Sequence, residues 1–278
     1  MIRSFPHMIN LILTLNVFIL FCYFVCFGSF LNVLAHRFFH SNISFNCIKL
    51  GFCAITWTLC KQSYCPSCKN NIAWFDLVPI VSWIILRGSC RSCKQSISPI
   101  YPLVELITGL SFAAMMMLIE PQFWVGYILF FSALIVTIHT DFQTMFIMRH
   151  FTLGIIPIGL IFSTLHLLPI TLYESILGIF VGYGILWSVN ALYKLINNTD
   201  GIGQGDKELL ATIGCFVGPL SCWLSLLIAS FLGSCIGIIM LCQKKSTTTR
   251  IPFGPFLSLG ALIATLFQPQ LYYLFFLL

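Results

Sequence analysis

Two aspartates stand at the ends of long apolar runs in a chain that carries few charges. Asp141 follows the apolar residues 130–138, and Asp206 closes a Gly-Ile-Gly-Gln-Gly-Asp stretch at residues 201–206. A carboxylate at a membrane boundary is energetically costly, so its presence suggests a functional role. Because both acids occupy such boundaries, we expect the two carboxylates to meet in the folded protein.

Two carboxylates that share a site can perform acid–base chemistry on a peptide bond. The ionised carboxylate activates a water molecule, while the protonated one polarises the scissile carbonyl group. Gly203 and Gly205 have no Cβ and would let a peptide backbone approach Asp206, so they are candidate substrate-binding residues. The structural alternative makes Asp206 a helix N-cap and leaves Asp141 at a water-exposed helix end.

Four of the 13 cysteines form two C-x-x-C pairs, whereas the other cysteines are scattered. Cys65 pairs with Cys68, and Cys90 pairs with Cys93. Two such pairs can supply four thiolates to a tetrahedral Zn²⁺ ion. Redox use, disulfides and metal-free packing are the alternatives, and a reducing cytoplasmic location argues against disulfides. Four protein ligands leave no open coordination position, so the predicted Zn²⁺ site is structural.

The composition is that of a membrane protein, with 59% hydrophobic and 8% charged residues. A soluble domain carries about a quarter charged residues. We therefore predict an all-α polytopic membrane protein with about eight transmembrane helices, the sixth and seventh joined by a tight turn at Gly218-Pro219. The predicted spans are Ile9–Leu34, Leu103–Ile119, Phe123–Thr140, Phe151–Leu168, Leu172–Tyr193, Lys207–Leu220, Cys222–Leu241 and Pro252–Phe267.

The basic residues predict the orientation of these spans. All but Arg3 of the 14 Lys and Arg residues fall in four segments that one face of the membrane would carry: 36–101, 141–150, 194–207 and 243–250. Cytoplasmic loops are enriched in such residues, so this face is expected to be cytoplasmic and to carry both aspartates. The net charge of +6 then has a topological origin, and no nucleic-acid partner is expected.

The same patterns divide the chain into three expected parts. Residues 1–35 form a first transmembrane helix, residues 36–101 a cytoplasmic zinc-binding domain, and residues 102–278 a membrane peptidase domain of about seven helices. Two apolar pieces of the middle part, Gly51–Leu59 and Leu77–Leu86, are too short to span a bilayer. We expect them to pack within the small domain or to lie on the membrane surface, where the basic residues could meet anionic lipid.

Two further ionisable residues have both a functional and a structural interpretation. His139 could hydrogen-bond near Asp141, or it could simply lie at the level of the lipid headgroups. Glu105 could contact a cationic substrate, or it could be a structural carboxylate with satisfied hydrogen bonds. The sequence contains no P-loop with a following Lys-Ser/Thr, no G-x-S-x-G and no H-E-x-x-H, so it gives no sign of the hydrolases built on those motifs.

These residues resemble the motifs of the bacterial type IV prepilin peptidases, the leader peptidases of type IV pilus and type II secretion systems. The resemblance runs in order from residue 28 to the segment around residue 260. Besides the cysteine pairs and Asp141, the motifs that carry it are Gly28-Ser29-Phe30-Leu31-Asn32-Val33, Trp83-x-x-Leu86-Arg87-Gly88-x-Cys90-Arg91-x-Cys93, Tyr101-Pro102-Leu103-Val104-Glu105-Leu106, Gly201-x-Gly203-x-Gly205-Asp206-x-x-Leu209-Leu210-Ala211 and Ile251-Pro252-Phe253-Gly254-Pro255-Phe256.

The resemblance implies a multi-pass aspartyl endopeptidase of the bacterial inner membrane with its active site on the cytoplasmic side. Asp141 and Asp206 occupy the catalytic positions of the family. Such an enzyme removes the basic leader of prepilins and pseudopilins after a glycine, and it cuts while the apolar prepilin helix lies in the bilayer. Many members then N-methylate the new terminus with S-adenosylmethionine as the methyl donor. The resemblance implies no particular oligomeric state.

The sequence departs from the family pattern near both aspartates. The family usually has an acid two residues after the first aspartate and a Leu/Ile-Pro-Asp further on, where this chain has Gln143 and Ile147-Met148-Arg149. The usual Lys two residues after the second aspartate is Glu208. The departures leave open a degenerate scaffold that binds prepilin without cutting it. An ion- or metal-coupled transporter is a further alternative, although it predicts acids near span centres.

Overall fold

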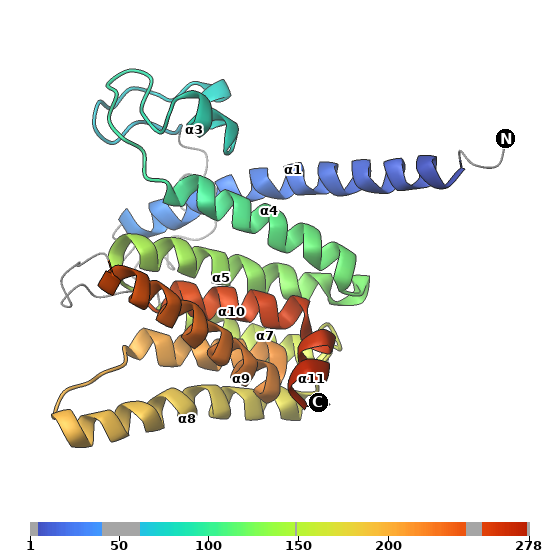
Figure 1. The fold of residues 1–278 in the computed structure, drawn as a ribbon, viewed down its shortest axis with the longest axis vertical. Helices are drawn as coiled ribbons and strands as arrows, with labels where there is room; N and C mark the ends of the chain where they lie inside the picture. Colours follow the sequence, from blue (N-terminus) through green and yellow to red (C-terminus); the bar gives the residue numbers. More distant parts are fainter. Residues whose placement is uncertain (1–4, 41–61, 148, 243–251, 277–278) are drawn as a thin grey trace, which may run out of the picture. The chain divides into compact units, whose positions relative to one another are not determined.

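The computed structural model describes residues 5–40, 62–147, 149–242 and 252–276, and its regular structure there is helical apart from two isolated β-bridges (Figure 1). The prediction of an all-α membrane protein is confirmed for this part of the chain. Two compact units are present, Met1–Ala113 and Ala114–Leu278. The predicted apolar piece Gly51–Leu59 lies outside the described residues, and the predicted three-part division stays a prediction.

The first unit holds the long helix α1, most of a second long helix, α4, and a small loop-rich segment. Helix α1 spans Phe5–His40, and α4 spans Ile100–Leu118; between them lie the short helices η2, Trp74–Leu77, and α3, Val81–Ile85. Phe24 of α1 stacks on Phe112 of α4 with ring centroids 5.1 Å apart. A Cβ at Gly28 would lie 2.8 Å from Thr108, so glycine is what lets these two helices approach so closely.

The second unit contains the remaining helices. In chain order they are η3 Pro121–Phe123, α5 Trp124–Thr144, α6 Arg149–Thr152, η4 Leu153–Ile155, α7 Ile156–Thr164, α8 Leu172–Asn197, α9 Gln204–Cys242, α10 Gly254–Leu266 and α11 Gln268–Phe276. Helix α8 starts with a capping box, in which Thr171 and Glu174 satisfy each other's backbone amides. Glycines of α8 and α9 face each other, so these helices pack backbone to backbone.

Helix α9 is interrupted by a reversal at Gly218. The backbone of Gly218 has φ 78° and ψ 173°, which glycine adopts readily, and Pro219 follows. The Sγ atom of Cys222 lies 3.6 Å from the carbonyl oxygen of Leu210, although 12 residues separate them. A straight helix would place those residues about 18 Å apart. The two limbs therefore fold against each other, which confirms the predicted turn at Gly218-Pro219.

Five helices of the described residues are long and apolar enough to cross a membrane. They lie within α1, α4, η3–α5, α8 and α9, and the last of these contains the reversal. Two shorter apolar helices, Leu153–Thr164 and Gly254–Leu266, occur where the sequence predicts the fourth and eighth spans. The order of apolar segments thus follows the prediction, while the number of complete spans stays a prediction.

Candidate active site

Asp141 lies in the last turn of α5 and is almost completely buried, with 4% of its surface exposed. Helix α5 ends three residues later, because Met145 adopts a left-handed conformation and donates its amide to the Asp141 carbonyl oxygen. The side-chain Oδ2 of Asp141 accepts a hydrogen bond from the Gly254 amide, 3.0 Å away. Gly254 is the first residue of α10, so this carboxylate lies at a helix N-terminus, where negative charge is favoured.

Asp206 lies in the first turn of α9 and is half-buried. Its carboxylate accepts a hydrogen bond from the backbone of Gly203. Because α9 begins at Gln204, Asp206 is not the N-cap residue, although its side chain does satisfy an amide at this helix end. A Cβ at Gly203 would lie 3.0 Å from Asp206 Oδ2, so the glycine leaves room for this side chain.

The structure brings the two aspartates together. Asp141 and Asp206 are close enough to interact electrostatically. Ile147, which follows α5, packs between the starts of the two helices that carry Gly205 and Gly254. A Cβ at Gly205 would lie 2.9 Å from Ile147 Cβ, and one at Gly254 would lie 3.0 Å from Ile147 Cδ1. The space beside Gly205 is therefore filled by this chain itself, and a role of Gly203 or Gly205 in substrate binding stays a prediction.

The glycine-rich loop before Asp206 is held by a buried asparagine of α8. The side-chain Oδ1 of Asn190 accepts hydrogen bonds from the amides of Gly201 and Ile202, each 2.9 Å long. Its Nδ2 donates to Asp200 Oδ1 at 3.0 Å. Hydrogen bonds from Asn190 and then Lys194 lower the pKa of Asp200. Sequence reasoning missed Asn190, whose only signal is an amide side chain in an otherwise apolar helix.

A bidentate ion pair joins α6 to α9 close to Asp206. Arg149 donates from Nε to Glu208 Oε2 at 3.1 Å, and its second nitrogen lies 2.8 Å from Glu208 Oε1. Gln204 also donates to Oε1, and the Thr212 hydroxyl donates to the Thr152 carbonyl oxygen at 3.0 Å. Arg149 and Glu208 are two of the positions at which the sequence departs from the family pattern, and the structure pairs them.

The two other ionisable candidates are both buried. His139 has 1% of its surface exposed, so its side chain is enclosed by protein, and its depth in the membrane stays a prediction. Glu105 of α4 accepts the Ile80 amide at 2.8 Å and hydrogen bonds from the side chains of Ser29 and Asn32. A carboxylate with this many donors matches the structural interpretation rather than one of substrate contact.

The four cysteines of the two C-x-x-C pairs converge. The thiols of Cys65, Cys68, Cys90 and Cys93 all lie within 4.8 Å of one another, and the Sγ atoms of Cys65 and Cys93 are 3.8 Å apart. Four sulfurs at about 2.3 Å from a tetrahedral Zn²⁺ would be about 3.8 Å apart, so the residues present fit this ion.

Both cysteine pairs sit in the same local structure. After the first pair, Lys69 has φ 62° and donates its amide to the Cys65 carbonyl oxygen; after the second pair, Lys94 has φ 60° and donates to the Cys90 carbonyl oxygen. The backbone amide of Cys68, followed by that of Ser67, lowers the pKa of the Cys65 thiol to about 6. A thiol that ionises so readily is suited to metal coordination.

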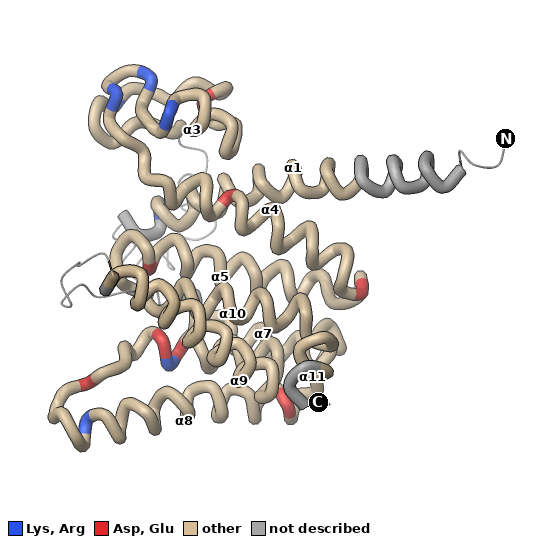
Figure 2. Tube along the Cα trace, in the orientation of Figure 1, with Lys and Arg blue, Asp and Glu red and all other residues tan. Residues whose placement is uncertain are grey.

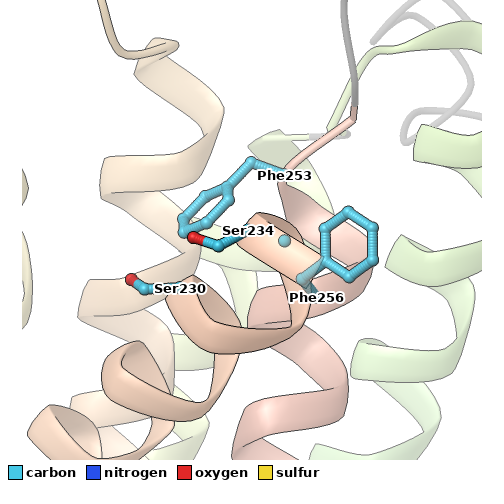
Figure 3. Close-up of a pocket in the computed structure, with 5 residues that line it drawn as sticks. Ser230, Ser234, Phe253 and Phe256 are labelled. Atoms are coloured by element: carbon cyan, nitrogen blue, oxygen red, sulfur yellow. The ribbon is translucent and has the colours of Figure 1, made fainter. Parts of the chain in front are cut away.

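A pocket of about 350 Å³ opens beside the start of α10. Its lining includes Ser230 and Ser234 from the second limb of α9, Phe253, which precedes α10, and Phe256 in the first turn of α10 (Figure 3). Gly254, which hydrogen-bonds Asp141, lies between two of these lining residues in the sequence, and the cavity is large enough for an apolar side chain.

Comparison with known proteins agrees with this arrangement. The Bacterial Peptidase A24 N-terminal domain model matches residues 22–119, and the Type IV leader peptidase family model matches residues 128–238. The Type 4 prepilin-like proteins leader peptide-processing enzyme of Escherichia coli O78:H11 is 33% identical, over 88% of this chain and 91% of that protein. The prepilin leader peptidase/N-methyltransferase of Aeromonas hydrophila is also 33% identical, over 89% of each chain.

The protein with that same name from Stutzerimonas stutzeri is 35% identical, over 76% of this chain and 73% of its own length. No solved structure matches the chain. The matched segments contain the four cysteines and both aspartates, and the similarity extends over most of each relative. The chain therefore belongs to the type IV leader peptidase family and is a multi-pass membrane peptidase.

Proposed function

We propose that the protein is an aspartyl endopeptidase that removes the basic leader of type IV prepilins and pseudopilins by cutting after a glycine. The observation that carries this proposal is the meeting of Asp141 and Asp206, which come from the end of α5 and the start of α9. Lys207 interacts electrostatically with Asp206, but no ion pair to either acid is present among the described residues. Such a pair is free to exchange protons with water and substrate.

The surroundings of the two acids suggest separate roles. The Gly254 amide and the N-terminus of α10 both favour negative charge on Asp141, so we assign it the ionised role of activating water. Asp206 would then hold the proton and donate it to the scissile carbonyl oxygen, which assists attack by the water molecule. The proton taken from the water passes to Asp141, and the two acids exchange roles when the amine leaves.

The location of the pair fits a substrate that is itself a membrane helix. Both acids lie at the ends of apolar segments rather than at their centres, which favours peptide cleavage at the membrane boundary over ion transport. A prepilin could keep its apolar helix in the bilayer and present its leader junction to the acids on the cytoplasmic side.

Two further features are part of this proposal. Zn²⁺ bound by Cys65, Cys68, Cys90 and Cys93 would stabilise the small domain and would not enter the reaction, since all four positions are protein ligands. The relatives from A. hydrophila and S. stutzeri are named as N-methyltransferases. By that similarity, we propose that this protein also transfers a methyl group from S-adenosylmethionine to the new N-terminus.

The test is an incubation of the full-length protein in proteoliposomes with a prepilin and S-adenosylmethionine, read by mass spectrometry. The parent should produce the shortened prepilin, and both D141N and D206N should produce none at unchanged protein level. E120Q changes an exposed acid whose identified partner is Gln122, and it should cleave normally. Binding of prepilin without cleavage by the parent would instead indicate a scaffold. Cleavage without added mass would remove only the methylation proposal.

A further inference from the structure

The small domain between α1 and α4 exposes a group of large apolar side chains on its two short helices, η2 and α3. On η2, Trp74 is 81% exposed; on α3, Ile84 and Ile85 are 62% and 69% exposed. Phe75, Leu77, Val78 and Val81 of the same stretch are exposed as well. A cluster of this size on a small domain marks a binding surface, because water would disfavour it. We call residues 74–85 the η2–α3 surface.

These exposed apolar side chains are distinct from the packed interior of the domain. The domain has its own internal packing, in which the Trp83 indole donates to the Ile97 carbonyl oxygen at 3.1 Å and covers Gly88. A Cβ at Gly88 would lie 2.9 Å from the Trp83 ring. Trp83 therefore faces the domain, while its neighbours on α3 point away from it.

The position of α3 relative to the bilayer follows from one hydrogen bond. Ile80, the residue before α3, donates its amide to Glu105 of α4 at 2.8 Å. Helix α4 has 19 residues, or about 28 Å, which matches the thickness of the hydrocarbon layer. Glu105 comes five residues after the start of α4 and two residues into the predicted span Leu103–Ile119, so it lies close to the level at which this helix enters the hydrocarbon layer. The start of α3 is held at that depth.

This attachment is rigid. Ile80 has φ 59°, which is strained for a β-branched residue and persists only where the surroundings enforce it. The carboxylate that holds it is itself fixed by Ser29 and Asn32 of α1, and Asn32 donates to the Tyr101 carbonyl oxygen. Helices α1 and α4 together therefore fix the start of α3.

The charges of the domain suit an anionic membrane surface. Lys69, Arg87, Arg91 and Lys94 are exposed, and Asp76, the acid of this segment, is paired with Arg91 at 2.7 Å. In Figure 2 the basic positions of the small domain lie to the left of α3. Basic residues beside an inserted apolar face are attracted to anionic lipid headgroups.

We propose that the η2–α3 surface is a membrane-docking surface, embedded in the leaflet where α4 begins and backed by basic residues that face anionic headgroups. The partner is the lipid bilayer, because the Ile80–Glu105 hydrogen bond places the surface at the level of the hydrocarbon boundary. The inference rests on α4 spanning the membrane and is independent of the proposed peptidase function. It assigns to the small domain a fixed orientation on the membrane.

The test places a photoreactive amino acid, p-benzoylphenylalanine, at position 85 or at Gln95 of the full-length protein in native membranes. Gln95 is an exposed polar residue of the second cysteine knuckle and serves as the control. Irradiation should give lipid adducts at position 85 and none at position 95, as read by mass spectrometry. A covalent adduct to another protein, or to residues 41–61 of this chain, in place of lipid would overturn the proposal.

A second measurement separates insertion from folding. The I84E/I85E variant should lose its protection from trypsin added to inverted vesicles and be cut at Arg87, while zinc content and prepilin cleavage report an intact fold. Nanodiscs with neutral lipid only should give fewer lipid adducts at position 85 than nanodiscs with phosphatidylglycerol. Equal protease protection of I84E/I85E and the parent would show that lipid does not cover this face.

Discussion

The ion pair between Arg149 and Glu208 offers the sharpest quantitative test of the site. Glu208 is 2% exposed and lies two residues after Asp206. Its carboxylate contacts two nitrogens of the Arg149 guanidinium group. The R149A variant would leave this buried carboxylate with Gln204 as its remaining identified side-chain donor. Breaking a fully buried pair costs about 3–5 kcal/mol.

The cost here should be lower, because the Arg149 side chain is 61% exposed and water can reach the vacated position. We expect about 2 kcal/mol for R149A. For a chain of this size that loss corresponds to a decrease of about 4–8 °C in the midpoint of thermal unfolding. If α6 and the start of α9 also separate by about 1 Å, cleavage should fall by about 10²-fold.

The assay measures the thermal midpoint in detergent together with prepilin cleavage for R149A, R149D, E208K and the exchanged pair R149D/E208K. The exchange restores opposite charges in the order that the family usually carries, so it should recover most of both losses. K194A is the control, because Lys194 and Asp200 form an exposed pair at 3.4 Å whose loss should leave the midpoint unchanged. An R149A midpoint equal to the parent's, or an exchanged variant as impaired as the sum of R149D and E208K, would refute the reasoning.

Three further predictions follow from the same structure. G254A should reduce cleavage about 10²-fold, because its Cβ would lie 2.7 Å from Asp141 Oδ2, whereas G184A, with nothing within 4 Å, should cleave normally; equal activity of the two would contradict the packing. Elemental analysis should find about one Zn²⁺ per chain and a large loss in C90S, and a zinc-free active parent would exclude the site. Without metal, the folded chain lowers the pKa of Cys65 from 9.0 to about 6, so the stability from its thiolate is complete above 9.0 and is lost as the pH falls through 6; the difference in unfolding midpoint between the chelator-treated parent and chelator-treated C65S should shrink across this interval, and a difference unchanged at pH 5 would contradict this.

Local patterns in the sequence predicted several parts of the fold. Apolar runs indicated the helices, since a membrane span has a fixed length and few charges. Gly218-Pro219 indicated the reversal of α9, because a glycine without a Cβ followed by a proline without an amide disfavours a continuous helix. The spacing of the four cysteines predicted that their thiols could converge, and the structure places them within 4.8 Å.

Other parts depend on contacts that no local pattern records. The sequence predicted one span over Phe151–Leu168, but this stretch contains α6, η4 and the nine-residue α7, because Pro157 allows a new helix to start there. The hydrogen bond from Gly254 to Asp141 joins residues 113 positions apart. The sequence does not predict this contact, since a glycine amide can donate to any nearby acceptor.

The cysteine cluster can be predicted from the sequence more directly than the pair of aspartates. Zinc ligands reveal themselves by type and spacing, because each pair must reach one ion through a short loop. The aspartates lie on separate helices, and their approach depends on Ile147, Asn190 and Gly254, which are chemically ordinary residues. Positions such as Arg149 and Glu208 look like separate losses of the family pattern when each is taken alone, yet together they form a single contact that keeps α6 against α9. The effect of a departure from the family pattern near the aspartates therefore depends on whether the residue contacts another departing position, as Arg149 contacts Glu208.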